Sequence, residues 1–390
     1  MELMKANHQW STRPSDERFW SLEEMGAYAR AVRDSARIAE VKYSDLSVEA
    51  AWGELHLMGK SARPAVVGNY AFGQLCQKVG APAGYLRSLG SEMAAKLVSF
   101  GLARRGAVDR EDKATLLLHE NGRSVVRAAT SDKYSRIWDC DIVSRLQDLA
   151  GWKTPPARPC GIPGERTRKA TAADVSLLTT AGGLAVKVGD DIAPAGLYAS
   201  DHDMFAFLVN EDRLINDGSG DQLARGFFLW NSEVGAKAFG VMTFLYKYAC
   251  GNHIVWGAKG VEEIRIIHIG HNQDAKAFRR LGAELRRYSD DSANEIEGVI
   301  AEARRLELGS NKDEVVEAVL GLARKSKAAL TERIIGTAYD VAAEHSDRYG
   351  SPSTLWGVVN GITEMSQRET FTEERVLLDR AAGKLLRVAF

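Results

Sequence analysis

Residues 131–136 combine hydroxyl, acidic, basic and aromatic side chains that could bind a phosphate group. The run reads Ser131-Asp132-Lys133-Tyr134-Ser135-Arg136. Lys133 and Arg136 would supply positive charge, and the hydroxyl groups would supply hydrogen-bond donors. The alternative is that Ser131 and Asp132 only cap the turn into a following helix, since turn chemistry explains such residues without a ligand. The run is therefore a candidate phosphate site with a purely local competing explanation.

A second group combines carboxylates with imidazoles. Its members are Asp190, Asp191, Asp201, His202 and Asp203, with His119, His268 and His271 as further candidates. Such side chains can hold a hard or borderline divalent cation. Their spacing matches no metal signature, however, and Asp pairs between strands are more often solvated turn residues. We therefore expect no metal site here.

Several catalytic and nucleotide-binding motifs do not occur in the sequence. It has no G-x-S-x-G, no G-x-x-x-x-G-K-[ST], and no G-x-G-x-x-G after a strand. The four cysteines (Cys76, Cys140, Cys160 and Cys250) show neither zinc spacing nor a disulfide framework. Nucleotide-driven and nicotinamide chemistry are thus disfavoured, no cofactor is expected, and a non-enzymatic role is favoured.

Charge is unevenly distributed along a chain whose net charge is only -1. Residues 101–170 contain 14 Lys and Arg against nine Asp and Glu, whereas residues 186–235 contain three against nine. Basic side chains beside strands rich in aromatic rings suit single-stranded nucleic acid, because cations follow the phosphates and rings stack on bases. The candidate residues are Lys133, Tyr134, Arg136, Arg158, Arg166, Arg168, Lys169, Trp230 and Tyr246. The alternative is that the rings are core residues and the basic loop is merely solvated.

The stretch 225–256 is expected to form the centre of the fold. Aromatic and apolar runs flank the turn-like Asn231–Gly235, which predicts two paired strands. Asn121-Gly122 is a strong hairpin signal. Ser21 and Glu24 have capping-box spacing, which predicts a helix after Ser21.

The predicted fold class is α+β. We expect a mixed or antiparallel sheet core with hairpins and flanking helices, plus a helical C-terminal region. The expected divisions are an N-terminal helical segment at 1–60, an α+β core at 61–271 with a Pro-rich loop at 151–170, and a helical region at 272–390. Long charged helices are expected at about 274–307 and 312–345, and shorter ones near 353–367 and 372–388.

Length and composition are those of a globular protein. The 390 residues are 45% hydrophobic and 26% charged, which allows a sizeable core and more than one folded unit. No apolar run is long enough to cross a bilayer, and the N-terminus has no apolar signal segment. We expect a soluble, cytoplasmic protein without membrane contact.

Several of these segments together resemble one family. They are Ser131–Tyr134, the turn Asn231-Ser232-Glu233-Val234-Gly235, the segment Cys250-Gly251-Asn252-His253, His268 with His271, and Trp356–Glu364. From about residue 65 to 390 the chain resembles the phage/plasmid-like family of unknown function, domain nine-three-two. His253 departs from the pattern, which has glycine after the asparagine. The resemblance implies no catalytic residues, but it does imply a mobile element, a cytoplasmic location, and a role in DNA metabolism or host counter-defence.

Three functions are consistent with these observations. The leading hypothesis is a protein that binds single-stranded DNA or RNA and self-associates, with strand annealing in recombination or replication as one form of it. The second is a non-enzymatic protein that acts on a host defence or replication factor through its helical C-terminal region. The third is a metal-dependent nuclease that uses Asp201, His202 and Asp203.

Overall fold

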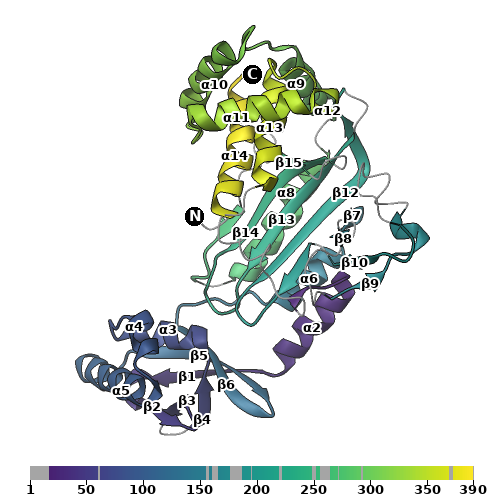
Figure 1. Cartoon of the computed structure of the whole chain (residues 1–390). Coiled ribbons are helices and arrows are strands. Elements are labelled where there is room, and N and C mark those ends of the chain that lie inside the picture. Colours follow the sequence, from purple (N-terminus) through teal and green to yellow (C-terminus); the bar gives the residue numbers. More distant parts are fainter. Residues whose placement is uncertain are drawn as a thin grey trace.

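Two large sheets and a C-terminal group of helices form the molecule (Figure 1). The computed structural model describes residues 17–59, 62–154, 158–159, 166–175, 187–194, 196–218, 222–247, 252–254, 264–270, 272–290, 293–368 and 372–389. Helices and mixed or antiparallel sheets both occur, with helices at the C-terminal end, so the predicted α+β class is confirmed.

The smaller unit is a six-stranded sheet with the strand order β1-β5-β6-β4-β3-β2. Its strands are β1 (Ala36–Lys42), β2 (Leu46–Ala51), β3 (Glu54–Gly59), β4 (Ala62–Val67), β5 (Lys113–Asn121) and β6 (Arg123–Ser131). Its helices are α3 (Asn69–Lys78), α4 (Ala83–Ser88) and α5 (Ser91–Val108). Only the β4–β6 pair is parallel among these strands. The predicted hairpin is confirmed, because Asn121 pairs with Arg123 across Gly122, whose φ is +71°.

One expectation for this region is wrong. The helix predicted after Ser21 is present as α2 (Leu22–Asp34), and Ser21 caps it by accepting from the Glu24 amide. The rest of the supposed helical segment is mainly strand, with β1, β2 and β3 between Ala36 and Gly59 and one short 3-10 helix at Tyr43–Asp45. The reason is visible in β2, where Leu46 and Val48 are buried while the residues that alternate with them are not, a period of two.

The larger sheet has the order β11-β12-β13-β14-β15, with β16 also on β14 and the short β7 on β12. These strands are β7 (Trp152–Lys153), β11 (Leu197–Ala199), β12 (Met204–Asn216), β13 (Gln222–Asn231), β14 (Phe239–Lys247), β15 (Asn252–Ile254) and β16 (Ile264–Ile266). As predicted, the aromatic stretch is an antiparallel pair, β13 with β14, joined by a turn that begins after Asn231. A small sheet of β8 (Arg158–Pro159), β10 (Asp191–Ala193) and β9 (Arg168–Lys169) lies apart from it.

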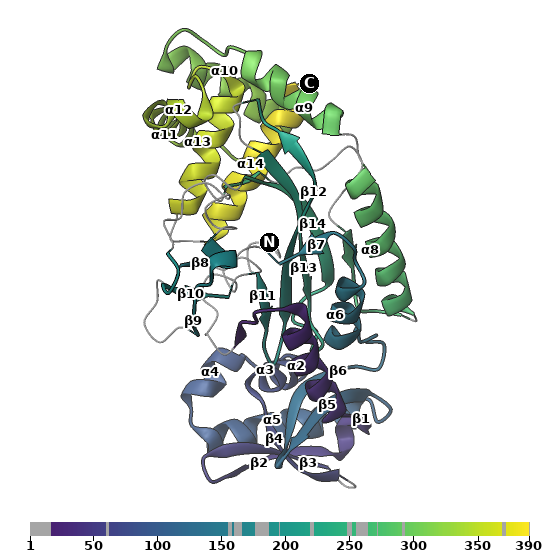
Figure 2. The same ribbon diagram turned by 90° about the vertical axis from the view of Figure 1, so that its right-hand side faces the viewer.

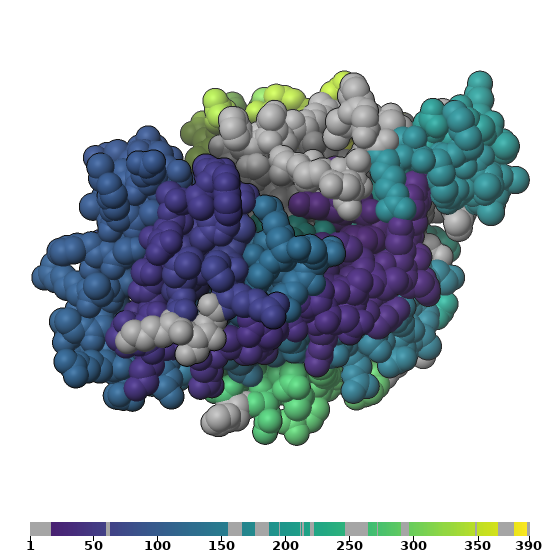
Figure 3. Space-filling model, turned by 90° about the horizontal axis from the view of Figure 1, so that it is seen from below, coloured from purple at the N-terminus to yellow at the C-terminus, as the bar shows by residue number. Residues whose placement is uncertain are grey.

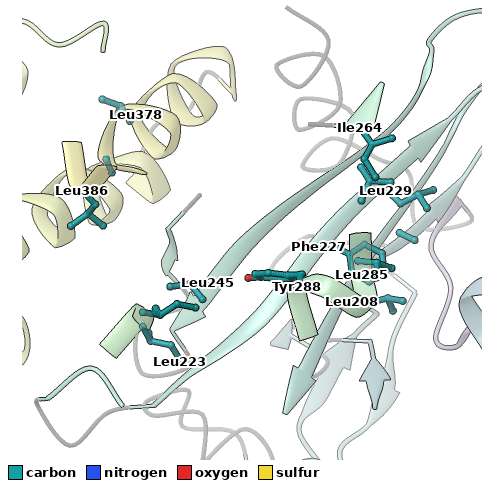
Figure 4. Close-up of a cluster of buried hydrophobic side chains, with 14 of the residues drawn as sticks. Leu208, Leu223, Phe227, Leu229, Leu245, Ile264, Leu285, Tyr288, Leu378 and Leu386 are labelled. Atoms are coloured by element: carbon teal, nitrogen blue, oxygen red, sulfur yellow. The ribbon is translucent and has the colours of Figure 1, made fainter. Parts of the chain in front are cut away.

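Helices α6 (Asp139–Gln147) and α8 (Gln273–Asp290) cover one face of the large sheet (Figure 2). Tyr288 of α8 lies across the strands, and its hydroxyl donates to the Phe244 carbonyl at 2.6 Å (Figure 4). The apolar cluster beneath it includes Leu208, Phe227 and Leu285 and continues to Leu386 near the C-terminus. The sheet and the C-terminal helices therefore share one core.

The C-terminal helices are α9 (Ala293–Arg305), α10 (Lys312–Ser326), α11 (Glu332–Glu344), α12 (Ser346–Tyr349), α13 (Leu355–Arg368) and α14 (Thr372–Ala389). The helix predicted at 312–345 is broken, because Lys327 adopts a left-handed conformation and Thr331 caps a new helix through its side chain. The segment expected as one α+β core at 61–271 contributes to several apolar clusters, and the two largest lie one in each sheet unit.

Candidate functional site

Two neighbouring cavities lie where the small unit meets the large sheet. The larger, about 640 Å³, is lined by α3, the end of β6, the turn after β13, and the segment 265–269. The smaller, about 440 Å³, is lined by α3, α4 and the loop before β12. Gln74 and Gln77 of α3 line both, so the two cavities adjoin at this helix. We call the two cavities together the junction groove.

Helix α3 is held in place by one amide side chain. Gln74 donates from Nε2 to the Val234 carbonyl at 2.8 Å, and its Oε1 accepts from the Ala129 amide at 2.8 Å. The same side chain thus joins α3 to β6 and to the turn that follows β13. The wall of the groove is fixed by hydrogen bonds from both sheets.

The motif turn Asn231–Gly235 connects the two sheets, and all of it except the exposed Gly235 is buried. Asn231 donates from Nδ2 to the Ile137 carbonyl at 2.9 Å and to Asp139 Oδ1 at 2.7 Å. Ser232 Oγ donates to the His202 carbonyl at 2.6 Å. Asn231, Ser232 and Glu233 are at most 1% exposed. These residues position the groove and cannot themselves contact a ligand from solvent.

A buried ion pair links the turn to the small sheet. Arg127 Nη1 of β6 lies 3.3 Å from Glu233 Oε2, and both side chains are almost fully buried. Glu233 Oε1 accepts from the Asp139 amide at 3.0 Å. Burial, and after it the nearby Glu233 charge, raises the pKa of Asp139 well above its ordinary value. The guanidinium thus offsets one carboxylate, while the second is driven toward its neutral form.

Another buried pair lies at the groove itself. Lys237 Nζ is 3.0 Å from Asp203 Oδ2 and 4.3 Å from the centre of the Phe205 ring. Asp203 Oδ1 also accepts from Ser200 Oγ at 3.0 Å. In the same loop, His202 Nδ1 lies 2.6 Å from Asp201 Oδ1, and the His202 ring stacks on Tyr70. These contacts account for the Asp201, His202 and Asp203 group as local structure.

Positive side chains dominate the lining. Lys78, Arg105, Lys237 and Arg265 border the larger cavity and Arg87 borders the smaller. Asp201 is the single carboxylate residue among those that the described structure places in the lining. Arg105 pairs with Asp112, whereas Lys78 and Arg87 have no ion pair with any residue in the described ranges. Arg87 is instead held by Asn69 Oδ1 at 2.9 Å, which leaves its charge uncompensated.

Two stacked rings close one end of the groove. The Tyr134 and His268 rings lie 5.2 Å apart at an angle of 13°, and the Tyr134 hydroxyl donates to the Ser232 carbonyl at 2.8 Å. His268 Nδ1 lies 3.0 Å from the Ser135 carbonyl. Burial lowers the pKa of His268 to about 4 and raises the pKa of Tyr134. Both rings are therefore neutral at ordinary pH.

The 131–136 run is divided between groove and core. Tyr134 lines the larger cavity, and Lys133 is exposed nearby without lining it. Arg136 points inward, donates to the Glu233 carbonyl, and lies against the Tyr134 and Trp138 rings. The predicted phosphate site is therefore not assembled from this run alone.

The basic loop is neutralised by local carboxylates. Arg166 pairs with Glu24, Arg168 with Asp174, and Lys169 with Asp191 at 3.0 Å. The side chains of Arg158, Tyr246, Cys250 and Asn252 lie outside the described residues. Surface pairs of this kind contribute little stability, but they reduce the positive field that a phosphate would meet.

The prediction that Trp230 stacks on bases is wrong. Its side chain is fully buried and lies over Gly240, the residue that pairs with it across β13 and β14. A Cβ atom at position 240 would lie 2.0 Å from the indole ring. The glycine leaves the space that the ring fills, so Trp230 is part of the core.

The aspartates and histidines proposed as metal ligands serve other contacts. Asp190 Oδ2 accepts from the Lys187 amide at 2.7 Å in a turn, which agrees with the alternative that these aspartates are turn residues. Within the residues that the structure describes, no three His, Cys, Asp or Glu are grouped so that they could hold a metal ion. His271 lies outside those residues.

The sequence interpretation missed the groove residues of α3 and α4. Gln74, Gln77, Lys78 and Arg87 follow ordinary helical patterns, and the two backbone partners of Gln74 lie 55 and 160 positions away in the chain. The one available signal was the motif turn, whose backbone Gln74 contacts.

Comparison with known proteins identifies a family without a described activity. No curated protein and no solved structure matches the chain. In the described part of the chain, no helix has the length and apolar character needed to span a bilayer. A family model described as "Domain of unknown function (DUF932)" matches residues 176–387, which include the motif turn, Lys237, Arg265 and His268. Since this match spans more than half of the 390 residues, the chain belongs to the DUF932 family.

Proposed function

We propose that this protein binds single-stranded nucleic acid in the junction groove. The observation that supports the proposal most is the composition of the lining, which holds five cationic side chains and a single carboxylate residue. Lys237 and Arg105 are paired with carboxylates behind the lining, whereas Lys78 and Arg87 have no ion pair within the described ranges. A polyanion is the ligand that such a lining favours, because each phosphate contact releases condensed counterions. The chain's net charge of -1 supplies no general attraction, so binding depends on this local set.

The shape of the groove favours a chain over a compact ion. Lys78 borders one cavity and Arg87 the other, while Gln74 and Gln77 lie between them. A single phosphate would use one of these cations, whereas a strand would contact both. The glutamine amides can donate to phosphate or to base edges, and Gln77 has no side-chain hydrogen bond among the described residues.

Aromatic rings border both cavities. The half-buried Tyr70 ring lines the smaller cavity, and Tyr134 lines the larger. Stacking of a base on such a ring contributes about 1–3 kcal/mol and tolerates any base. Tyr70 is the ring that takes the part the sequence assigned to Trp230, because Tyr134 already stacks on His268 and has Arg136 over its ring. The expected ligand is therefore a strand bound with little sequence preference.

The proposal includes a role in strand annealing during recombination or replication of a mobile element. This setting comes from the family resemblance, and a groove that holds one strand suits the reaction. The test is the rate at which complementary labelled strands anneal with and without the protein. Binding without acceleration would remove the annealing role and leave the binding site in place.

The binding test compares two variants that lose the same charge. Lys78→Gln with Arg87→Gln neutralises the groove, and Arg166→Gln with Lys169→Gln neutralises the basic loop. Fluorescence anisotropy of a labelled single strand is measured across a salt series. The wild-type affinity should fall with salt, and the groove variant should lower the slope of log K against log salt by about 1.4, or roughly 0.7 per lost contact.

The loop variant is the matched control and should retain the wild-type slope. Circular dichroism and the melting temperature establish that both variants are folded. If the wild type does not bind single strands even at low salt, or if only the loop variant loses affinity, the proposal is wrong.

A further inference from the structure

Helix α5 has apolar residues on two opposite faces. One face packs on the small sheet through Ala94, Ala95, Val98 and Leu102. On the other face, Met93, Leu97 and Phe100 are 49%, 41% and 69% exposed. A helix in a folded protein normally has one apolar face toward the core and polar residues on the opposite face. The exposed face is thus a surface without a partner in the described structure.

The exposed residues form one stripe. Positions 93, 97, 100 and 104 are separated by four, three and four residues, the spacing that aligns side chains along one side of a helix. Figure 1 places α5 at the outer edge of the small unit, away from the large sheet. In Figure 3, the blue part of the chain around residue 100 forms one edge of the molecule. Nothing described in this chain lies over the stripe.

Charges at the two ends of the stripe are complementary to each other. Glu92 lies in the first turn of α5, on the flank of the stripe and about 100° around the helix axis from Met93. Arg104 lies near the other end, at the position that completes the stripe. Both are exposed, and neither has an ion pair with any part of the chain that the structure describes. A helix with an acidic residue at one end and a basic residue at the other is complementary in charge to an antiparallel second copy of itself.

We propose that this stripe pairs with the same stripe of a second copy, with the two α5 helices antiparallel. In a two-fold arrangement the same patch faces itself, so residue i meets residue j and residue j meets residue i. Setting Leu97 against Phe100 of the copy brings the Glu92–Met93 end of each helix beside Arg104 of the other. Two apolar contacts and two ion pairs then form at once.

Dimer formation leaves the junction groove open. Arg105, which lines the groove, is five positions after Phe100 and is therefore rotated by roughly 140° from it around the helix axis. The two proposals consequently rest on opposite sides of α5 and can fail separately.

Sedimentation velocity across a concentration series tests the proposal. The wild type should form a dimer, and Phe100→Asp should weaken dimerisation at least 100-fold because it places a charge at the centre of the pair. Ile38→Asp changes an apolar residue that is 50% exposed on β1, and it should leave the dimer unchanged.

Charge reversal supplies the sharper test. Glu92→Arg alone or Arg104→Glu alone places like charges at both ends of the pair and should weaken dimerisation about 10-fold. The combined variant E92R/R104E restores opposite charges and should return the dissociation constant to within about twofold of the wild type. A monomeric wild type, a dimer that tolerates Phe100→Asp, or a combined variant no better than the single ones would each overturn the proposal.

Discussion

The buried pair of Arg127 and Glu233 makes the strongest prediction about stability. Arg127→Met would leave Glu233, which is 1% exposed, without its cation. Removing one partner of a buried ion pair typically costs about 3–5 kcal/mol, because the remaining charge has no compensation. Arg127 also donates from Nε to the Asp201 carbonyl at 3.1 Å, which places its loss toward the upper end of that range.

Glu233→Gln is the complementary change. The glutamine keeps an oxygen that can accept from the Asp139 amide, so its main effect is to leave Arg127 with neutral acceptors. The double variant R127M/E233Q removes both charges together. Its loss of unfolding free energy should be smaller than the sum of the single losses by about 2 kcal/mol, within the usual range for residues in contact.

Urea unfolding of the four proteins measures this coupling. The assay follows tryptophan fluorescence. Trp230 lies three residues before Glu233, and Trp138 precedes Asp139, whose amide donates to Glu233. Single losses below about 1 kcal/mol, or a coupling near zero, would show that the pair does not join the motif turn to the small sheet. The motif turn would then not act as a connector between the two sheet units.

Two further predictions concern His268 and Gly240. Burial lowers the pKa of His268 to about 4 from an ordinary 6.5, so the unfolded protein takes up a proton at this side chain more readily than the folded protein. The folded protein is therefore most stable above pH 6.5, and it loses free energy of unfolding as the pH falls toward 4. The loss of unfolding free energy from this side chain should reach about 2 kcal/mol at pH 5. His268→Asn should remove that part of the acid sensitivity, as measured by urea unfolding at several pH values. A pH profile that is the same in the variant and the wild type would contradict the prediction. Gly240→Ala should lower the unfolding free energy by about 1–3 kcal/mol, because its methyl group would clash with Trp230. Gly298→Ala is the control: in helix α9 its methyl group would meet no atom within 4 Å, so it should raise the unfolding free energy by about 0.5–1 kcal/mol. If the two glycine variants changed the melting temperature equally, the Trp230 ring would not fill the space over Gly240.

Local patterns predicted the local elements well. Asn121-Gly122 identified the β5–β6 hairpin, and Ser21 with Glu24 identified the start of α2, because both signals act within a few residues. The aromatic stretch correctly identified β13 and β14 as a pair. The strands from Ala36 to Gly59 were missed because they are short and half-buried, so that their alternation extends over few residues.

The site required information that the sequence does not contain. Whether Trp230 faces solvent depends on Gly240 in the next strand, and whether Arg168 is available depends on Asp174. The junction groove combines α3 with a turn about 160 positions later, as the contact from Gln74 to Val234 shows. The family resemblance singled out the motif turn, and the structure shows that its residues 231–234 are buried connectors.

Photo-crosslinking of a single strand to the protein tests the central claim most directly. A single-stranded oligonucleotide with photoreactive bases is irradiated with the wild-type protein, and the attached peptides are identified by mass spectrometry. We predict attachment to the α3 peptide that contains Tyr70 and Gln77 and to the peptide that contains Tyr134. Attachment confined to the basic loop around Arg166 and Lys169, or none in the groove at low salt, would contradict the proposed binding site.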